Sequence, residues 1–205
     1  MSIVFLGEGL KTVATKSAEV ASKIPDFAKD VSFKSGTRIS EEGIKVPDFN
    51  GPKEYIPRTG GEWTGEAGNS KWKPSAGDIP KKQNHGEKTW QEILDAYDID
   101  GVEFKDGYPD FSDVAKESVE IDNFTDDRNI NFLQADKKTA EKWSAENKDG
   151  KSWTSEDVRN YRKENNLTWH EHEDMQTLQL VPSEIHGNIP HSGGVAAIKN
   201  KMMEG

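Results

Sequence analysis

The chain has 205 residues and no cysteine, which excludes disulfides and metal sites built on thiolates. Any metal must therefore be held by His, Asp, Glu or Asn. The net charge of -10 is unusual for a protein that binds nucleic acid, because phosphate contacts normally need a basic surface. Residues 150–205 carry six Lys or Arg against eight Asp or Glu, so most of the acidity lies elsewhere.

The N-terminal quarter is predicted to be an arm, or the junction to a delivery region, over residues 1–50. Within it, Leu10–Ile24 has a loose apolar stripe that predicts a short helix. Met1–Leu6 is too short for a secretory signal, and no apolar run approaches a membrane span. We therefore expect no membrane insertion by this chain, and export by a specialised system or as part of a larger parent chain.

Residues 51–88 are rich in Gly, Pro, Lys and Trp and predict irregular structure with short strands. A helix is expected over Thr89–Tyr97, with four residues on one side: Trp90, Ile93, Leu94 and Tyr97. The segments Val102–Phe104 and Ser118–Ile121 predict strands that flank a turn at Gly107–Asp110. With six Trp and eight Phe available, a small core is expected to rest on aromatic anchors.

Two further helices precede the C-terminal region. The first is expected over Asp126–Asn147, with a buried face formed by Ile130, Leu133, Ala140 and Trp143. The second starts at Thr154 or Ser155 and runs to about Asn165. Its Arg159 and Arg162 lie within one turn of each other and are candidates for a phosphate clamp; the alternative is a solvated charged face.

Residues 167–205 hold four of the five histidines of the chain. Thr168–His172 has the period of a strand, so that His170 and His172 share one face and Glu171 points to the other. A polar turn follows, then a returning strand over Thr177–Val181. Pro182 fits the first turn of a short helix that carries His186, and His191 lies just beyond its end. Strand, turn, strand and short helix is the order found in ββα-metal nucleases.

These residues carry a resemblance to the HNH/endonuclease VII superfamily, and in particular to the toxin nucleases named for a Trp-His-His motif in bacterial polymorphic toxins. The C-terminal motif consists of Trp169-His170, Leu178–Pro182, His186 and His191–Gly194. Three upstream stretches resemble the same toxins: Gly61–Glu66, Gly68–Trp72 and Gly107–Ser112. The resemblance implies an α+β fold, with a ββα-metal (HNH) motif at about residues 166–200 on a small mixed α/β domain with long loops. The toxin nuclease domain would span residues 51–205.

A nuclease of this kind needs one divalent ion and a general base. His186 and His191 are the first candidates for metal ligands, with His170 as the third. The ion would be Zn²⁺ or Mg²⁺, with Mn²⁺ or Ni²⁺ as alternatives. Asp174, in the turn, could orient an imidazole through its second nitrogen.

The general base stays open among three residues. Where the named motif has a second histidine, this chain has Glu171, which takes the base position by resemblance. His172 is the candidate from strand alternation, which places it beside His170. In the third arrangement His170 is the base and only His186 and His191 hold the ion.

The function that follows is a metal-dependent endonuclease toxin that cuts DNA in the cytoplasm of a competitor bacterium. It would be delivered there by a specialised system and would have a cognate immunity protein in the producer. Three alternatives remain: an RNase toxin, a metal-dependent phosphoesterase on small substrates, and a non-catalytic zinc-stabilised module that binds nucleic acid or a protein. A structural zinc site normally uses four protein ligands, which distinguishes the last from a catalytic centre.

Overall fold

The computed structural model describes residues 38–39, 45–46 and 55–204. The chain divides into two compact units, residues 1–48 and 49–205. In the first unit β1 (Arg38–Ile39) pairs with β2 (Lys45–Val46) in antiparallel orientation. The predicted helix over Leu10–Ile24 lies outside the described residues, and the role of residues 1–50 as an arm or junction stays a prediction.

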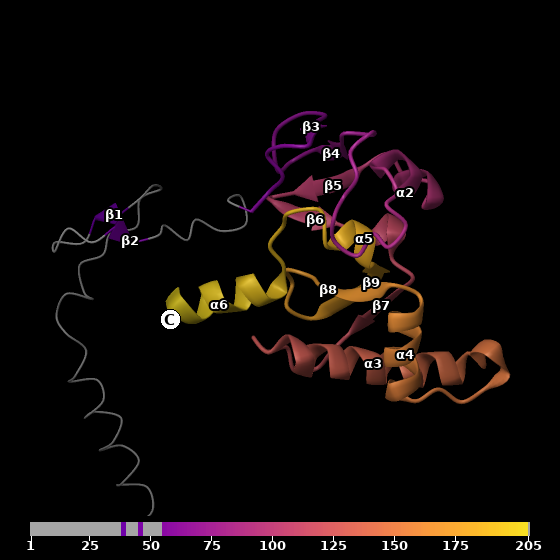
Figure 1. Ribbon diagram of the computed structural model, residues 1–205. Coiled ribbons are helices and arrows are strands. Elements are labelled where there is room, and N and C mark those ends of the chain that lie inside the picture. The colour runs from indigo at the N-terminus through magenta and orange to yellow at the C-terminus, as the bar shows by residue number, and fades with distance from the viewer. Residues whose placement is uncertain (1–37, 40–44, 47–54, 205) are drawn as a thin grey trace, which may run out of the picture. The chain divides into compact units, whose positions relative to one another are not determined.

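The second unit begins with an antiparallel sheet in the order β3-β4-β5-β6 (Figure 1). Its strands are β3 (Gly61–Trp63), β4 (Lys71–Pro74), β5 (Val102–Lys105) and β6 (Tyr108–Asp110). The turn that was expected at Gly107–Asp110 is wrong by two residues, because Tyr108–Asp110 forms strand β6. The chain reverses instead at Asp106 and Gly107, whose φ angles of 53° and 86° suit a two-residue hairpin turn with two left-handed residues.

Helix α2 (Trp90–Ala96) packs beside this sheet and confirms the predicted helix. Its start is set locally by a capping box: the Thr89 hydroxyl accepts from the Glu92 amide, and the Glu92 carboxylate accepts from the Thr89 amide. Trp90, Ile93 and Leu94 are buried as expected. They join a core with residues of β4, β5, β9 and the segment that follows β9.

A second antiparallel sheet has the order β7-β9-β8. It consists of β7 (Glu117–Glu120), β8 (Leu167–Glu171) and β9 (Thr177–Pro182), with β9 in the centre. Helices α3 (Arg128–Ala145) and α4 (Ser155–Glu164) cover one face of it and enclose a second core, which includes Trp143, Trp153 and Trp169 (Figure 1). The strands predicted around residues 102 and 118 therefore belong to different sheets.

The buried face of α3 differs from the expected one. Ile130 and Leu133 are 48% and 60% exposed, whereas the polar residues Asn131, Asp136 and Thr139 are buried. Ala140 and Trp143 are buried as predicted. The inward face of this helix is chosen by specific hydrogen bonds, described below, and an apolar pattern does not reveal them.

The C-terminal hairpin follows the predicted order of strand, turn, strand and helix. In its turn the Asp174 carboxylate accepts hydrogen bonds from the amides of Gln176 and Thr177 and from the Thr177 hydroxyl. One turn of helix, α5 (Ser183–His186), follows β9 directly, and α6 (Gly194–Glu204) closes the chain. Two 3-10 turns complete the elements, η3 (Ser112–Val114) and η4 (Lys148–Gly150). The whole confirms the α+β class, and over the residues that the structure describes no helix is long and apolar enough to cross a membrane.

Candidate metal centre

Three histidines from separate elements meet between the two sheets. His170 lies on β8, His186 on α5 and His191 in the loop before α6. One ring nitrogen from each lies within 4.8 Å of the others. His170 Nδ1 and His186 Nε2 are 3.3 Å apart, and the ring centroids of His186 and His191 are separated by 4.6 Å. The structure therefore brings together the three side chains that the sequence marked as candidate ligands.

Strand alternation explains why His170 points into this cluster. On β8 its neighbours Trp169 and Glu171 face α3 and α4, where they bond to Asp136 and Asn131. His170 takes the opposite face, which α5 covers. Both faces of the strand are therefore buried.

The Phe111 ring packs against all three histidine rings of the cluster. Its ring centroid lies 4.9 Å from that of His170, 5.5 Å from that of His186 and 5.3 Å from that of His191. The side chain is 1% exposed. Sequence reasoning did not give Phe111 a role in the site, although it belongs to the Gly107–Ser112 stretch that resembles the toxin nucleases.

Glycine is required where the C-terminal loop crosses the end of β8. A Cβ on Gly193 would stand 2.6 Å from the Glu171 carbonyl oxygen, and one on Gly194 would stand 2.4 Å from that of His172. Such distances are too short for a side chain, so the two glycines let the loop bring His191 against the strand that carries His170.

We expect Gly193→Ala to lower the free energy of unfolding by about 1–3 kcal/mol, as overpacking of a close contact does. It should also weaken binding of Zn²⁺, because the loop that holds His191 must move away from β8. Gly77→Ala is the matched control, since a Cβ there meets nothing within 4 Å. Urea unfolding and a zinc titration of both variants measure the two effects. Equal stability and equal zinc affinity in the two variants would show that the close approach has no such role.

The electrostatics of the cluster favour neutral imidazoles. Burial lowers the pKa of His170 well below its usual 6.5, lowers that of His186 to about 3, and lowers that of His191. The positive charge that any one ring would carry also disfavours a second charge close by. All three rings are therefore uncharged at pH 7, the state in which an imidazole nitrogen offers its lone pair to a metal.

The donor set fits a divalent ion. The 3.3 Å between His170 Nδ1 and His186 Nε2 matches the edge of a tetrahedron whose ligands stand about 2.0–2.1 Å from a central zinc. The Nδ1 of His191 lies 2.7 Å from the Ile189 carbonyl oxygen, and this contact holds the ring with its other nitrogen free. His170 Nε2 is buried and has no hydrogen-bond partner among the described residues. An ion bound by these three nitrogens would stabilise the arrangement.

Residues 101–193 match the family described as the DNase/tRNase domain of colicin-like bacteriocin. The matched part contains both strands of the hairpin, α5, Phe111 and all three clustered histidines. It supports a nuclease domain of bacteriocin type in this part of the chain. A search of curated proteins gives no match.

The other predicted residues take different places. The Glu171 carboxylate is buried on the α3 side of β8 and is hydrogen-bonded by Arg128 and Asn131. His172 lies just beyond β8 with 32% of its side chain exposed, and its Nδ1 is 3.4 Å from Asp174 Oδ2. The Asp174 backbone N–H donates to this Nδ1 at 3.3 Å. The predicted role of Asp174 in orienting an imidazole stays a prediction.

The predicted phosphate clamp does not form in this structure. Arg162 is buried against α3, where its Nε and Nη2 each donate to an Asp136 oxygen at 2.7 Å. Arg159 is exposed and pairs with Glu156 one turn earlier on the same helix. The two guanidinium groups thus turn to different sides of α4, because Asp136 captures the one that faces α3.

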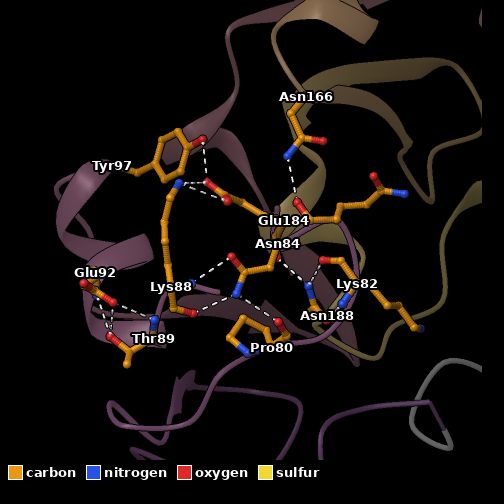
Figure 2. A network of polar contacts seen from close by, with 11 residues as sticks. Pro80, Lys82, Asn84, Lys88, Thr89, Glu92, Tyr97, Asn166, Glu184 and Asn188 are labelled. Atoms are coloured by element: carbon orange, nitrogen blue, oxygen red, sulfur yellow. Dashed lines mark hydrogen bonds and ion pairs between the residues drawn. The ribbon is translucent and has the colours of Figure 1, made fainter. Parts of the chain in front are cut away.

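A polar network joins α5 and Asn188, two residues beyond it, to the segment around α2 (Figure 2). The buried Glu184 carboxylate lies 3.3 Å from Lys88 Nζ and accepts a hydrogen bond from the Tyr97 hydroxyl at 3.2 Å. Below it, the Asn188 amide bonds both the N–H and the carbonyl of Lys82. A single helical turn has little stability of its own. These contacts with the loop before α2 therefore give His186 a fixed support.

Proposed function

We propose that this domain is a metal-dependent endonuclease of the ββα-metal (HNH) type that hydrolyses phosphodiester bonds of DNA. The observation that carries the proposal is the cluster of three neutral imidazoles formed by the β8-β9-α5 motif and the loop after it, inside the segment that matches bacteriocin nucleases. RNA is the second candidate substrate, since the description of the matched family names both DNase and tRNase domains.

His170, His186 and His191 would hold the ion. Three imidazoles favour Zn²⁺ or Ni²⁺ over Mn²⁺ and Mg²⁺, which suit oxygen ligands. Three protein ligands leave a coordination position for a substrate oxygen, as catalytic sites require. When bound, the ion would supply charge stabilisation to the scissile phosphate and the leaving oxygen.

The geometry favours His172 as the proton acceptor among the three candidates. His170 has Nδ1 turned to His186 and is 1% exposed, so it suits a ligand. Both oxygens of Glu171 already accept hydrogen bonds on the far face of the strand. His172 has a ring that is partly open to solvent, with 32% of its side chain exposed, so it can reach a water molecule.

The zinc-stabilised binding module is the rival from another class. A structural zinc site is closed by four protein ligands. In the part of the chain with described side chains, three residues form the only group spaced to share an ion. That count supports an open, catalytic centre.

The biological role that we propose is that of a toxin in competition between bacteria. The match to bacteriocin nucleases supports it, and so do the upstream stretches that resemble polymorphic toxins. Such a toxin would be carried into the target cell by a specialised system, with residues 1–50 as the junction to the delivery region. The producing cell would need an immunity protein against it.

Cleavage of supercoiled plasmid by the purified protein tests the proposal. We expect nicking and linearisation with Zn²⁺, Ni²⁺, Mn²⁺ or Mg²⁺, and intact plasmid in EDTA. Structured RNA, tested in parallel, separates the two substrate classes. If both nucleic acids stay intact with every metal while the protein still binds zinc, the module without catalysis takes the place of the nuclease.

A further inference from the structure

Arg128 is the first residue of α3 and reaches the end of β8. Its Nε donates to Glu171 Oε2 at 3.0 Å, across 43 positions of sequence. The two side chains differ sharply in accessibility: that of Arg128 is 62% exposed and that of Glu171 is 3% exposed. The buried carboxylate thus anchors an arginine whose remaining atoms face solvent.

The Glu171 carboxylate is held in place by a second residue, Asn131. Glu171 Oε1 accepts from Asn131 Nδ2 at 2.8 Å, and Asn131 is completely buried. The oxygen of the Asn131 amide accepts from the backbone N–H of Thr125, and its nitrogen also donates to the Thr125 carbonyl. Both polar atoms of the Asn131 side chain are therefore engaged: the bonds to Thr125 fix the amide, and its remaining N–H holds the carboxylate that binds the guanidinium.

Only one donor nitrogen of the Arg128 guanidinium, Nε, is hydrogen-bonded among the described residues. Neither Nη1 nor Nη2 has a hydrogen-bond partner among the residues that the structure describes, whereas Arg162 spends both Nε and Nη2 on Asp136. A guanidinium presents its donors in a planar arrangement that matches two oxygens of a phosphate. Arg128 therefore has the free donors that the predicted clamp on α4 lacks.

Arg128 lies beside the end of β8. Glu171 directly follows His170 at this strand end, and its carboxylate leaves the strand on the α3 face, where it meets Arg128. The exposed positive charge of Arg128 at this place attracts an anion.

We propose that Arg128 binds a phosphate of the substrate beside the histidine centre, at the end of β8, through Nη1 and Nη2, and that Glu171 is its positioning residue and not the general base. This inference rests on the proposed nuclease function. It accounts for a carboxylate at the place where the Trp-His-His motif has a histidine, because an imidazole could not offer two acceptor oxygens to Arg128 and Asn131.

The test compares Arg128→Ala, Arg128→Lys and Glu171→Gln with Arg159→Ala, which removes the same charge from an exposed arginine on another helix. Binding of a 20-base-pair duplex is measured in EDTA, where nothing is cut, at several salt concentrations. Arg128→Ala should reduce the salt slope by about one, and Arg159→Ala should leave it unchanged. Zinc affinity should stay at the wild-type value in all four variants.

Cleavage then separates the two roles of Glu171. Arg128→Ala should lose roughly 10²–10³-fold in kcat/KM on plasmid, as loss of an oriented donor does, and Arg128→Lys should fall between. If Glu171 only positions Arg128, the double variant Arg128→Ala/Glu171→Gln is no slower than Arg128→Ala alone. A general base would make the two losses multiply.

If Arg128→Ala and Arg159→Ala bind the duplex equally well, Arg128 does not contact phosphate. The proposed nuclease function would still stand in that case, because it is tested by cleavage with the wild-type protein. Multiplying losses in the double variant would overturn the positioning role of Glu171. If the wild-type protein cuts neither DNA nor RNA, the proposed function fails on its own, and the contact of Arg128 with phosphate is still decided by the binding measurement.

Discussion

Replacement of His186 by alanine is expected to abolish metal-dependent cleavage, with a loss of at least about a hundredfold. Removal of a residue that merely orients a ligand typically costs 10–100-fold in metal affinity or activity, and removal of a ligand itself should cost no less. The same result is expected for His170→Ala, because His170 Nδ1 and His186 Nε2 lie 3.3 Å apart and the two rings share one ion in the proposed centre. Plasmid cleavage at saturating metal and calorimetric titration with Zn²⁺ measure the two losses.

His85 provides the matched control. It is the one histidine outside the C-terminal region, it lies in an exposed loop, and His85→Ala removes the same chemical group. We expect cleavage and zinc affinity within twofold of the wild type for this variant. If His170→Ala and His186→Ala cut plasmid as fast as His85→Ala does, the three-histidine cluster is not the reaction centre.

Replacement of Asp136 by alanine is expected to give the largest loss of stability. The Asp136 carboxylate is 2% exposed and accepts three hydrogen bonds: two from Arg162 at 2.7 Å and one from the Trp169 indole N–H at 2.8 Å. Its removal leaves the Arg162 guanidinium buried without a partner. Breaking a buried ion pair in this way typically costs about 3–5 kcal/mol. Urea unfolding should show a drop of this size.

Asp122→Ala is the control for this prediction, since it also removes a carboxylate that pairs with a side chain of α3. Its partner is Lys138, and the side chains of the two residues are 75% and 40% exposed. Exposed pairs contribute at most about 1 kcal/mol. A second variant, Asp136→Ala/Arg162→Met, removes both charges and should recover part of the lost stability. If Asp136→Ala is no less stable than Asp122→Ala, the Asp136–Arg162 pair does not hold α3, α4 and β8 together.

The parts of this protein that its sequence determined are those with local signals. The order β8, turn, β9, α5 could be predicted because alternation, the acidic turn at Asp174 and Pro182 all act over a few residues. Helices α2 and α4 begin where predicted, since Thr89 with Glu92 and Thr154 with Asp157 form capping boxes within one turn. The candidate ligands were also marked in advance, because imidazoles are rare in this chain and gathered in one segment.

Other features were decided by the tertiary structure alone. The sequence predicted an apolar buried face on α3, and the structure buries Asn131 and Asp136 there in place of Ile130 and Leu133. The reason is that partners for these polar groups come from β8 and α4, which lie 26 to 40 positions away in the chain. These two polar residues are buried because hydrogen-bond partners lie opposite them in the folded chain. The residues next to them in the sequence do not indicate where those partners are.

The same reason explains the arginines. Arg159 and Arg162 were equivalent candidates in the sequence, being one helical turn apart, while Arg128 stood at the start of another helix. Folding placed Asp136 beside Arg162 and Glu171 beside Arg128. Asp136 accepts from two donor nitrogens of Arg162, whereas Glu171 accepts from only one of Arg128. Tertiary contacts therefore decided which guanidinium is structural and which is left with free donors. Charge interactions of this kind depend on distance and burial in space, and neither can be read from spacing along the chain.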